Sequence, residues 1–417
     1  MNKIYNPIYI KRLSVICAFS YMVSYLTRLN FATVTVEIIR ETGWEISAVA
    51  APTTALFVFY GAGQFVSGYL GDRMRPEILI FSGLAFSSLM NFSIPFCATI
   101  PQMTVIWGLN GFAQAMLWPP IARILSGACD KKDYQKSTMK ILRAATFGTV
   151  FNFLLAALCT ATVGWRALFF INGSVALIYS VLFVFMYRSI KIYSRGEENA
   201  RFAAKAVSEQ TSDAPVEAVE KMPVKIWGLL SMVLLATIAL GSLRDSIQSW
   251  LPTFVAESFD IDGSTAMLTS VIMPLIIYIT YPFFLKYYRR FFKSEIACAS
   301  TFFAASATLV LILYFVSGVS PVLSVLLLAL SSTCMNGVNF LLIGLLPNRF
   351  EKYGNVSTIA GIINGFVYVG SSLSVFVIAV IAEKFGWKTT IITWSLLSVL
   401  GFIVCAGAFK SFKKYFK

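Results

Sequence analysis

The 417-residue sequence contains no histidine. Without histidine the chain has no imidazole metal ligand, no histidine proton relay and no catalytic triad built on an imidazole base. Charged residues make up only 13% of the chain, and the seven cysteines show neither CxxC nor CxH spacing. These absences argue against a metal centre and a disulfide framework. We therefore expect no metal, no cofactor and no enzymatic activity.

Hydrophobic residues, in contrast, make up 57% of the chain. This share is larger than the core of a water-soluble protein of this length requires. Because a spanning helix needs about 20 mostly apolar residues, runs of that length predict an all-α membrane protein with twelve transmembrane helices. The runs lie at 13–36, 47–70, 78–99, 102–127, 141–163, 166–187, 226–256, 265–286, 295–317, 320–347, 356–382 and 387–409. The first run lacks a small-residue cleavage site, so we expect it to remain as a helix.

Lysine and arginine are distributed unevenly between the loops. If the N-terminus is cytoplasmic, the cytoplasmic segments hold most of the basic residues. The opposite segments hold only Arg40, Arg166, Lys384 and Lys388. The positive-inside rule therefore predicts a multi-pass protein of the cell membrane with both termini in the cytoplasm. Since this pattern accounts for the net charge of +14, we expect contacts with membrane lipid and none with nucleic acid.

The segment 188–225 is polar and lacks apolar periodicity, which predicts a cytoplasmic linker. It separates an N-terminal half, 1–187, from a C-terminal half, 226–417, each with six of the predicted helices. Two such halves are typical of secondary transporters whose substrate site lies between the halves near the middle of the membrane. We expect the chain to act as a monomer.

Four ionisable residues lie deep inside the apolar runs: Arg28, Arg143, Arg244 and Asp245. A charge at the centre of a spanning helix costs roughly 2.5–3.5 kcal/mol, so these side chains should face a cavity or one another. Their summed charge is positive, and a guanidinium matches carboxylate or phosphate oxygens with a planar fork. We predict that Arg28 and Arg244 bind a small organic anion from opposite halves. The alternatives are that Arg244 only neutralises Asp245 and that Arg143 reaches the inner interface.

Tyr21 and Tyr25 lie seven and three residues before Arg28 and share its helix face approximately. Their hydroxyls would hydrogen-bond a bound anion. Ordinary aromatic packing is the alternative in a chain that is 15% aromatic.

Between the second and third runs, Gly68-Tyr-Leu-Gly-Asp72-Arg73 resembles the loop signature of the major facilitator superfamily. In that superfamily the acid and the arginine lock helix ends in one conformational state. The resemblance implies that Asp72 and Arg73 form such a conformational lock.

Within the superfamily, the chain resembles the organophosphate:phosphate antiporters, which include bacterial glycerol-3-phosphate and hexose-phosphate transporters. The matching residues are Tyr25-Leu-x-Arg28-x-Asn30-Phe31-Ala32, Tyr60-Gly61, Gln114 with Trp118-Pro119-Pro120 and Arg123, Leu243-Arg244 with Trp250, Pro252 and Thr253, and Tyr368 with Gly370. The resemblance implies that Arg28 and Arg244 grip phosphate. It also implies that Tyr368 belongs to the substrate site and that an organophosphate exchanges for inorganic phosphate by alternating access.

The chain also departs from this family. It has Gln64 and Ala145 where the glycerol-3-phosphate branch has a lysine and a histidine, and Asp245 where that branch has an aromatic residue. These changes lower the positive field of the site, so a monoanion or zwitterion competes with a dianionic phosphate ester as the substrate. Arg143 would restore the missing charge if it faces inward.

Two other functions stay open. One is a proton- or sodium-coupled symporter for a carboxylate such as a sugar acid, with Asp245 as its only embedded carboxylate. The other is a transporter-like membrane sensor, because the resembled family includes a receptor for phosphorylated sugars.

Overall fold

The computed structural model describes residues 3–44, 46–208, 222–260 and 263–415, and this part of the chain is helical throughout, without strands. The helices are α1 (Pro7–Thr33), α2 (Thr35–Thr42), α3 (Ile46–Arg73), α4 (Pro76–Ser93), η1 (Ile94–Phe96), α5 (Ile100–Ala115), α6 (Trp118–Ala128), α7 (Lys131–Thr162), α8 (Trp165–Ser208), α9 (Val224–Phe259), α10 (Gly263–Phe291), α11 (Glu295–Val316), α12 (Pro321–Asn339), η2 (Phe340–Leu345), η3 (Leu346–Tyr353) and α13 (Val356–Tyr415).

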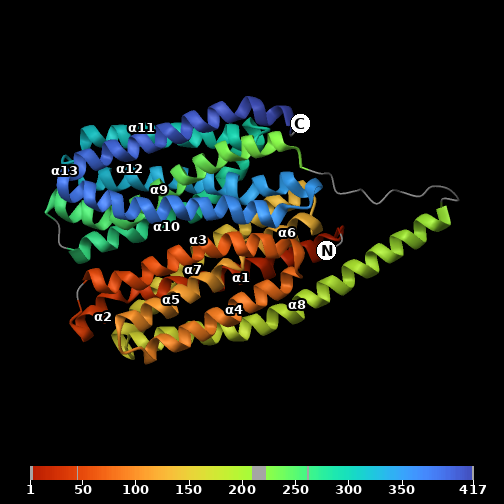
Figure 1. Cartoon of the computed structure of the whole chain (residues 1–417), viewed down its shortest axis with the longest axis horizontal. Coiled ribbons are helices and arrows are strands. Elements are labelled where there is room, and N and C mark those ends of the chain that lie inside the picture. Colours follow the sequence, from red (N-terminus) through yellow and green to blue (C-terminus); the bar gives the residue numbers. More distant parts are fainter. Residues whose placement is uncertain (1–2, 45, 209–221, 261–262, 416–417) are drawn as a thin grey trace.

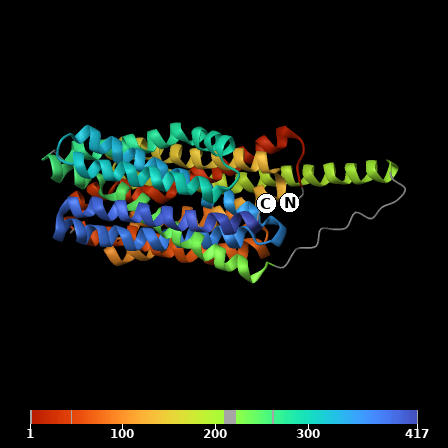
Figure 2. The same cartoon turned by 90° about the horizontal axis from the view of Figure 1, so that it is seen from above.

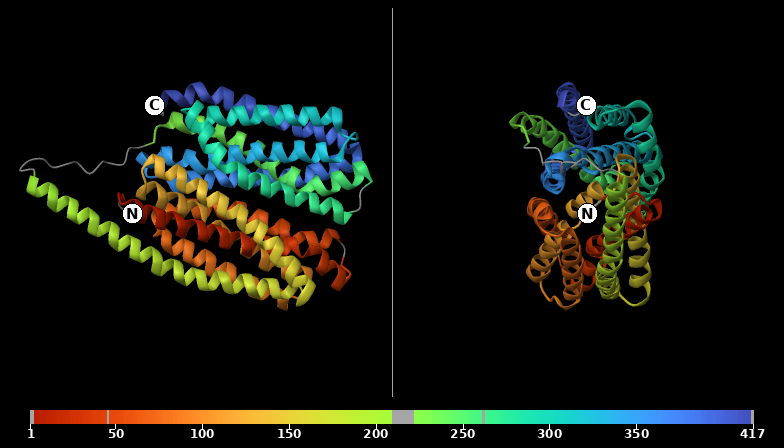
Figure 3. Two further views of the ribbon diagram at one scale, coloured as in Figure 1. Left: turned by 180° about the vertical axis from the view of Figure 1, so that it is seen from behind. Right: turned by 90° about the vertical axis from the view of Figure 1, so that its right-hand side faces the viewer.

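The helices pack in two groups whose long axes run in roughly the same direction. Helices α1–α8 form one group and α9–α13 the other, as the end-on view in Figure 3 shows. Both ends of the chain lie at the same end of the bundle, which we call the terminus end (Figures 1 and 2). The division into halves at 187 and 226 stays a prediction, and residues 209–221 of the predicted linker lie outside the described residues.

Eight helices of the described part are long and apolar enough to cross a membrane. Many large apolar side chains on the outside of the bundle are exposed; Leu154 is 66% and Phe185 65% exposed. Apolar surface on this scale suits contact with lipid rather than with water. The predicted all-helical membrane class is confirmed, whereas the number of twelve spans and their orientation stay predictions.

The helices break within several of the predicted apolar runs, including those at 102–127 and 320–347. The run at 102–127 is divided between α5 and α6, and the break directly precedes Pro119 and Pro120, which lack the backbone N–H that a continuous helix needs. The run at 320–347 passes from α12 into the π-helix η2 at Phe340. Between the last two runs, Gly386 interrupts α13 with a φ of 76°, a conformation that glycine adopts without steric cost.

The first part of the predicted linker is helical, a feature that its lack of apolar periodicity did not indicate. Residues 188–208 continue α8, which projects beyond the other helices at the terminus end (Figure 1). Alanine, arginine, glutamate and lysine, which all have high helix propensity, make up 11 of its 21 residues.

Helices α3 and α13 approach each other closely and join the two groups. A Cβ atom on Gly361 would lie 2.3 Å from the carbonyl oxygen of Gln64 and 2.7 Å from the Cα atom of Gly68. Only glycine fits at this crossing, because any side chain would push the helices apart. The crossing places the first part of α13, which carries Tyr368, beside α3 and within hydrogen-bonding distance of Arg28 on α1.

Candidate functional site

Arg28 of α1 is buried between the two groups of helices. Its guanidinium carbon lies 4.2 Å from the ring centroid of Tyr25 and 5.0 Å from that of Tyr60. Its Nη1 donates a hydrogen bond of 3.3 Å to the Tyr368 hydroxyl on α13, while its Nε is buried and has no hydrogen-bond partner. In the described part of the chain, no ion pair joins Arg28 to a carboxylate. The cation is therefore held by aromatic faces, with donor capacity left over for an anion.

Arg244 of α9 is fully paired instead. Its Nε and Nη2 donate to the two carboxylate oxygens of Asp245 at 2.6 and 2.9 Å, and its Nη1 donates to Oδ1 of Asn339 at 2.8 Å. The Ser371 hydroxyl donates to Asp245 Oδ2 at 2.5 Å. In this conformation Asp245 therefore neutralises Arg244 and occupies the face of the guanidinium that would grip a phosphate.

Helix α13 connects the two arginines. Its Tyr368 accepts a hydrogen bond from Arg28, whose guanidinium also covers Tyr25, and its Ser371 donates to Asp245, the partner of Arg244. We call Tyr25, Arg28, Arg244, Asp245 and Tyr368 the central cluster. With two arginines and one aspartate, the cluster carries a net charge of +1, contributed by helices from both groups.

A buried polar network fixes the part of α1 that carries Arg28. Asn91 of α4 and Asn110 of α5 donate to the backbone oxygen of Thr27 at 3.1 and 2.9 Å. Gln114 donates to the Thr27 hydroxyl at 2.7 Å. Hydrogen bonds of this kind between membrane helices contribute about 0.6 kcal/mol each on average. Together they hold α1 against α4 and α5 one residue before Arg28, so the arginine has a fixed position.

The remaining predicted site residues lie farther from the arginines. Tyr21 packs against Tyr25 and Trp118, with ring centroids 5.4 Å apart in each pair. Gln64 of α3 is buried and donates to the Ala115 backbone oxygen at 3.3 Å, and its own Oε1 has no partner. Both residues border the central cluster, so their role in substrate binding stays a prediction.

Arg143 lies elsewhere. Its guanidinium sits 4.5 Å above the ring of Tyr278 on α10 and lines a groove on the flank of the bundle, between α7 and α10. None of the described hydrogen bonds, ion pairs or ring contacts joins Arg143 to Tyr25, Asp245 or Tyr368 of the central cluster. The prediction that Arg143 restores the charge of the substrate site is untested.

Three residues of the site were not singled out from the sequence as binding residues: Tyr60, Asn339 and Ser371. Tyr60 belongs to a motif that carries the family resemblance, although no role was assigned to it. Asn339 is an amide inside an apolar run and directly precedes the π-helix η2; both features often mark functional positions. Nothing in the local sequence distinguishes Ser371 from the other serines of α13.

Asp72 connects α3 to the start of α13. Its two carboxylate oxygens accept hydrogen bonds from the backbone N–H groups of Ser357 and Thr358 at 3.0 and 2.6 Å, and the N-terminus of a helix favours such a negative charge. Arg73 remains within α3, where it donates to the Tyr69 backbone oxygen and covers the Tyr69 ring. Arg123 of α6 donates to the backbone oxygens of Gly71 and Met74 at the end of α3.

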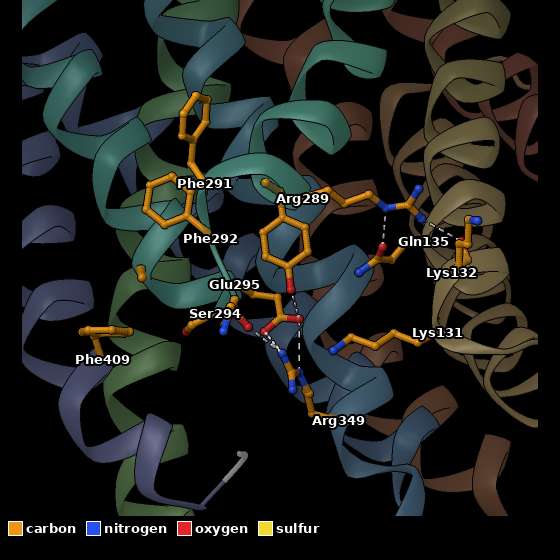
Figure 4. Close-up of a pocket in the computed structure, with 13 residues that line it drawn as sticks. Lys131, Lys132, Gln135, Arg289, Phe291, Phe292, Ser294, Glu295, Arg349 and Phe409 are labelled. Atoms are coloured by element: carbon orange, nitrogen blue, oxygen red, sulfur yellow. Dashed lines mark hydrogen bonds and ion pairs between the residues drawn. The ribbon is translucent and has the colours of Figure 1, made fainter.

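A second contact joins the two groups of helices at the terminus end, between α7 and α10. Arg289 donates through Nε to Gln135 Oε1 at 2.8 Å and through Nη2 to the backbone oxygen of Lys132 at 2.9 Å (Figure 4). The buried Glu295 beside it accepts hydrogen bonds from Arg349 (Figure 4). It also accepts one from the Tyr288 hydroxyl. The two groups of helices are thus bonded together at two places at the terminus end.

Replacing Asp72 with asparagine should open the terminus end. Asparagine loses the negative charge and offers one acceptor oxygen in place of two, so we expect the closed state to lose about 1–3 kcal/mol. Spin labels on Arg75→Cys and Lys352→Cys, in a protein without its native cysteines, would report the opening as a longer distance. Arg73→Gln removes contacts only within α3 and serves as the control. An unchanged distance in Asp72→Asn would rule out this lock.

Residues 17–367 match the family model of the Major Facilitator Superfamily. The chain belongs to this superfamily. It is therefore a multi-pass membrane transporter by family, which confirms the resemblance found in the loop signature at Asp72.

Several curated proteins are similar to the chain. The glycerol-3-phosphate transporter of Bacillus subtilis is 22% identical over 394 residues, which cover 87% of this chain and 84% of that protein. A probable hexose phosphate transport protein of Chlamydia muridarum is 26% identical over 166 residues, 40% of this chain and only 36% of that protein. The membrane sensor protein UhpC of Escherichia coli is 23% identical over 252 residues, covering 59% and 57% of the two chains.

Proposed function

We propose that this protein transports a small organophosphate in exchange for inorganic phosphate, by alternating access at the central cluster. The observation that carries the proposal is the state of Arg28, a buried guanidinium with an unpartnered Nε that no carboxylate neutralises in the described part of the chain. Such a group suits an anionic oxygen. The names of the similar hexose phosphate and glycerol-3-phosphate transport proteins support a phosphorylated substrate.

The two arginines would act in sequence. A phosphate that enters the central cluster meets Arg28 first, because the fork of Arg244 is occupied by Asp245. To reach Arg244, the phosphate must replace the Asp245 carboxylate as its partner. Ser371 would keep Asp245 hydrogen-bonded when Arg244 turns to the substrate. Since the empty cluster has a net charge of +1, we propose that it prefers a monoanionic form of the phosphate over the dianion.

We propose that the contacts of Asp72 and Arg289 close the terminus end in the described conformation. We propose that this end faces the cytoplasm and that residues 1–187 and 226–417 are the moving halves. Opening toward the cytoplasm would then require that both contacts break, while the hydrogen bond between Arg28 and Tyr368 gives way to bonds with the substrate.

Exchange can be tested in proteoliposomes loaded with inorganic phosphate. We expect uptake of labelled glycerol 3-phosphate or glucose 6-phosphate that requires internal phosphate and survives a protonophore. Vesicles without internal phosphate are the control. Uptake of sugar acids alone, lost when the ion gradient is dissipated, would contradict the exchange and favour the carboxylate symporter, for which the embedded Asp245 supplies a titratable group.

The similarity to a membrane sensor protein favours one other candidate function. A sensor would bind the phosphorylated ligand with little turnover. It would therefore show ligand-induced thermal stabilisation of the purified protein, with no exchange in the same proteoliposomes.

A further inference from the structure

A groove of about 1090 Å³ lies between α7 and α10, and none of the residues that line it belongs to the central cluster. We call it the α7–α10 groove. Its walls come from both groups of helices, with additional residues from α1. The side chains that line it are Phe19, Met22, Lys136, Met139, Lys140, Arg143, Ala144, Phe147, Tyr278, Pro282, Leu285, Lys286, Arg289 and Arg290.

The charge of the groove has a single sign. On α7 the basic residues follow helical spacing, with Lys136, Lys140 and Arg143 on one face. On α10, Lys286 and Arg290 are one turn apart and face them across the groove. Among the described residues that line it there is no aspartate or glutamate. The groove thus concentrates cations from both groups of helices without any carboxylate to neutralise them.

The remaining wall of the groove is apolar and faces outward. Phe19 of α1 and Phe147 of α7 are 48% and 49% exposed, and Met22 also lines the groove. Arg143, about 10 Å deeper along α7 than Lys136 at 1.5 Å per residue, has a buried Nε without a hydrogen-bond partner. The basic side chains therefore lie mainly at the terminus end of the groove. The apolar side chains line the part of the groove that extends from there toward the interior of the membrane.

We propose that the α7–α10 groove is a binding site for an acidic phospholipid. The phosphate head group would lie among Lys136, Lys140, Lys286 and Arg290, and an acyl chain would lie along Phe19 and Phe147. The cations would also attract a soluble phosphate, but a soluble phosphate has no apolar part that could contact the exposed aromatic wall. A lipid satisfies both parts of the groove at once.

Such a lipid would bridge α7 and α10 beside the contact between Arg289 and Gln135. It would contribute to closure of the terminus end, because its phosphate holds cations from both groups of helices together. The site is separate from the central cluster, so it does not depend on the transported substrate.

Native mass spectrometry of the full chain in neutral detergent tests this proposal, with phosphatidylglycerol and phosphatidylcholine as probes. We expect tight binding of phosphatidylglycerol alone. The variant Lys136→Gln/Lys140→Gln/Lys286→Gln/Arg290→Gln should bind it at least about tenfold more weakly, since each basic side chain near an anionic lipid surface strengthens binding roughly fivefold. The matched control, Lys3→Gln/Arg75→Gln/Arg188→Gln/Lys225→Gln, removes four exposed cations outside the groove.

An equal loss of lipid in the two variants would show attraction by net charge only and overturn the proposal. Equal binding of phosphatidylcholine would also overturn it, as would displacement of the lipid by millimolar inorganic phosphate, which would mark a site for soluble anions. If the fourfold variant does not fold, Lys136→Gln/Lys286→Gln removes one exposed lysine from each helix. In that variant, phosphatidylglycerol should raise the melting temperature less than in the wild type.

Discussion

Arg28→Gln is expected to lower organophosphate uptake at least about a hundredfold, the equivalent of losing one or two charge-assisted hydrogen bonds to the phosphate. The protein should still fold, because no described carboxylate depends on Arg28 and its removal leaves no opposite charge unpaired in the membrane. Arg28→Lys should also be impaired, because lysine keeps the charge but lacks the planar fork. Initial rates of exchange in proteoliposomes measure these effects.

The matched control for Arg28 is Arg166→Gln. Arg166 is also an arginine of the first group of helices, but it pairs with Glu41 at the opposite end of the bundle and is about half exposed. Organophosphate uptake by Arg166→Gln should match that of the wild type at equal protein levels. Normal uptake by Arg28→Gln would remove Arg28 from the substrate site and with it the proposed function.

Arg244→Gln is expected to lose both transport and stability. A second variant distinguishes the two effects. The substitution removes a phosphate ligand, and it also leaves the Asp245 carboxylate buried without its cation, which typically costs about 3–5 kcal/mol. We therefore expect a lower melting temperature together with a loss of uptake. Arg244→Gln/Asp245→Asn removes both charges and should regain most of the stability while uptake stays lost.

Asp245→Asn alone completes this set. It frees the fork of Arg244 and raises the net charge of the central cluster to +2, so binding of the dianionic phosphate should strengthen at least about tenfold. Thermal stabilisation by phosphate at two pH values, on either side of the second phosphate ionisation, measures the change in preference. Recovery of uptake in the double variant would show that Arg244 only neutralises Asp245 and does not touch the substrate.

The sequence located the arginines of the central cluster but not their partners. Burying a charge inside a membrane helix costs free energy, so such residues are rare. Arg28, Arg244 and Asp245 could therefore be identified within the apolar runs. Their partners Asn339 and Ser371 are separated from them by about a hundred residues or more of sequence, and uncharged polar side chains are common in membrane helices. Tyr60 and Tyr368 could be associated with the site only through the family resemblance.

For Arg143 the sequence identified a deep charge but not its neighbours, and its role in the substrate site stays a prediction. The helical period places Arg143 on the same face of α7 as Lys136 and Lys140, but the direction of that face depends on the helix packed against it. Tyr278 of α10 supplies that neighbour. The same packing creates the α7–α10 groove, whose two basic rows are separated by more than a hundred residues of sequence.

The sequence by itself determined that this is a membrane protein, that it is helical and which charged residues are buried. Hydrophobicity and charge are properties of each residue, so they can be read without knowing where the residue lies in the fold. The tertiary structure decided which charges meet. Asp245 neutralises Arg244 and leaves Arg28 without a carboxylate partner in the described part of the chain, and Asp72 reaches the start of α13. These pairings depend on how the helices rotate and cross, and the crossing at Gly68 and Gly361 is set by contacts between segments far apart in the chain.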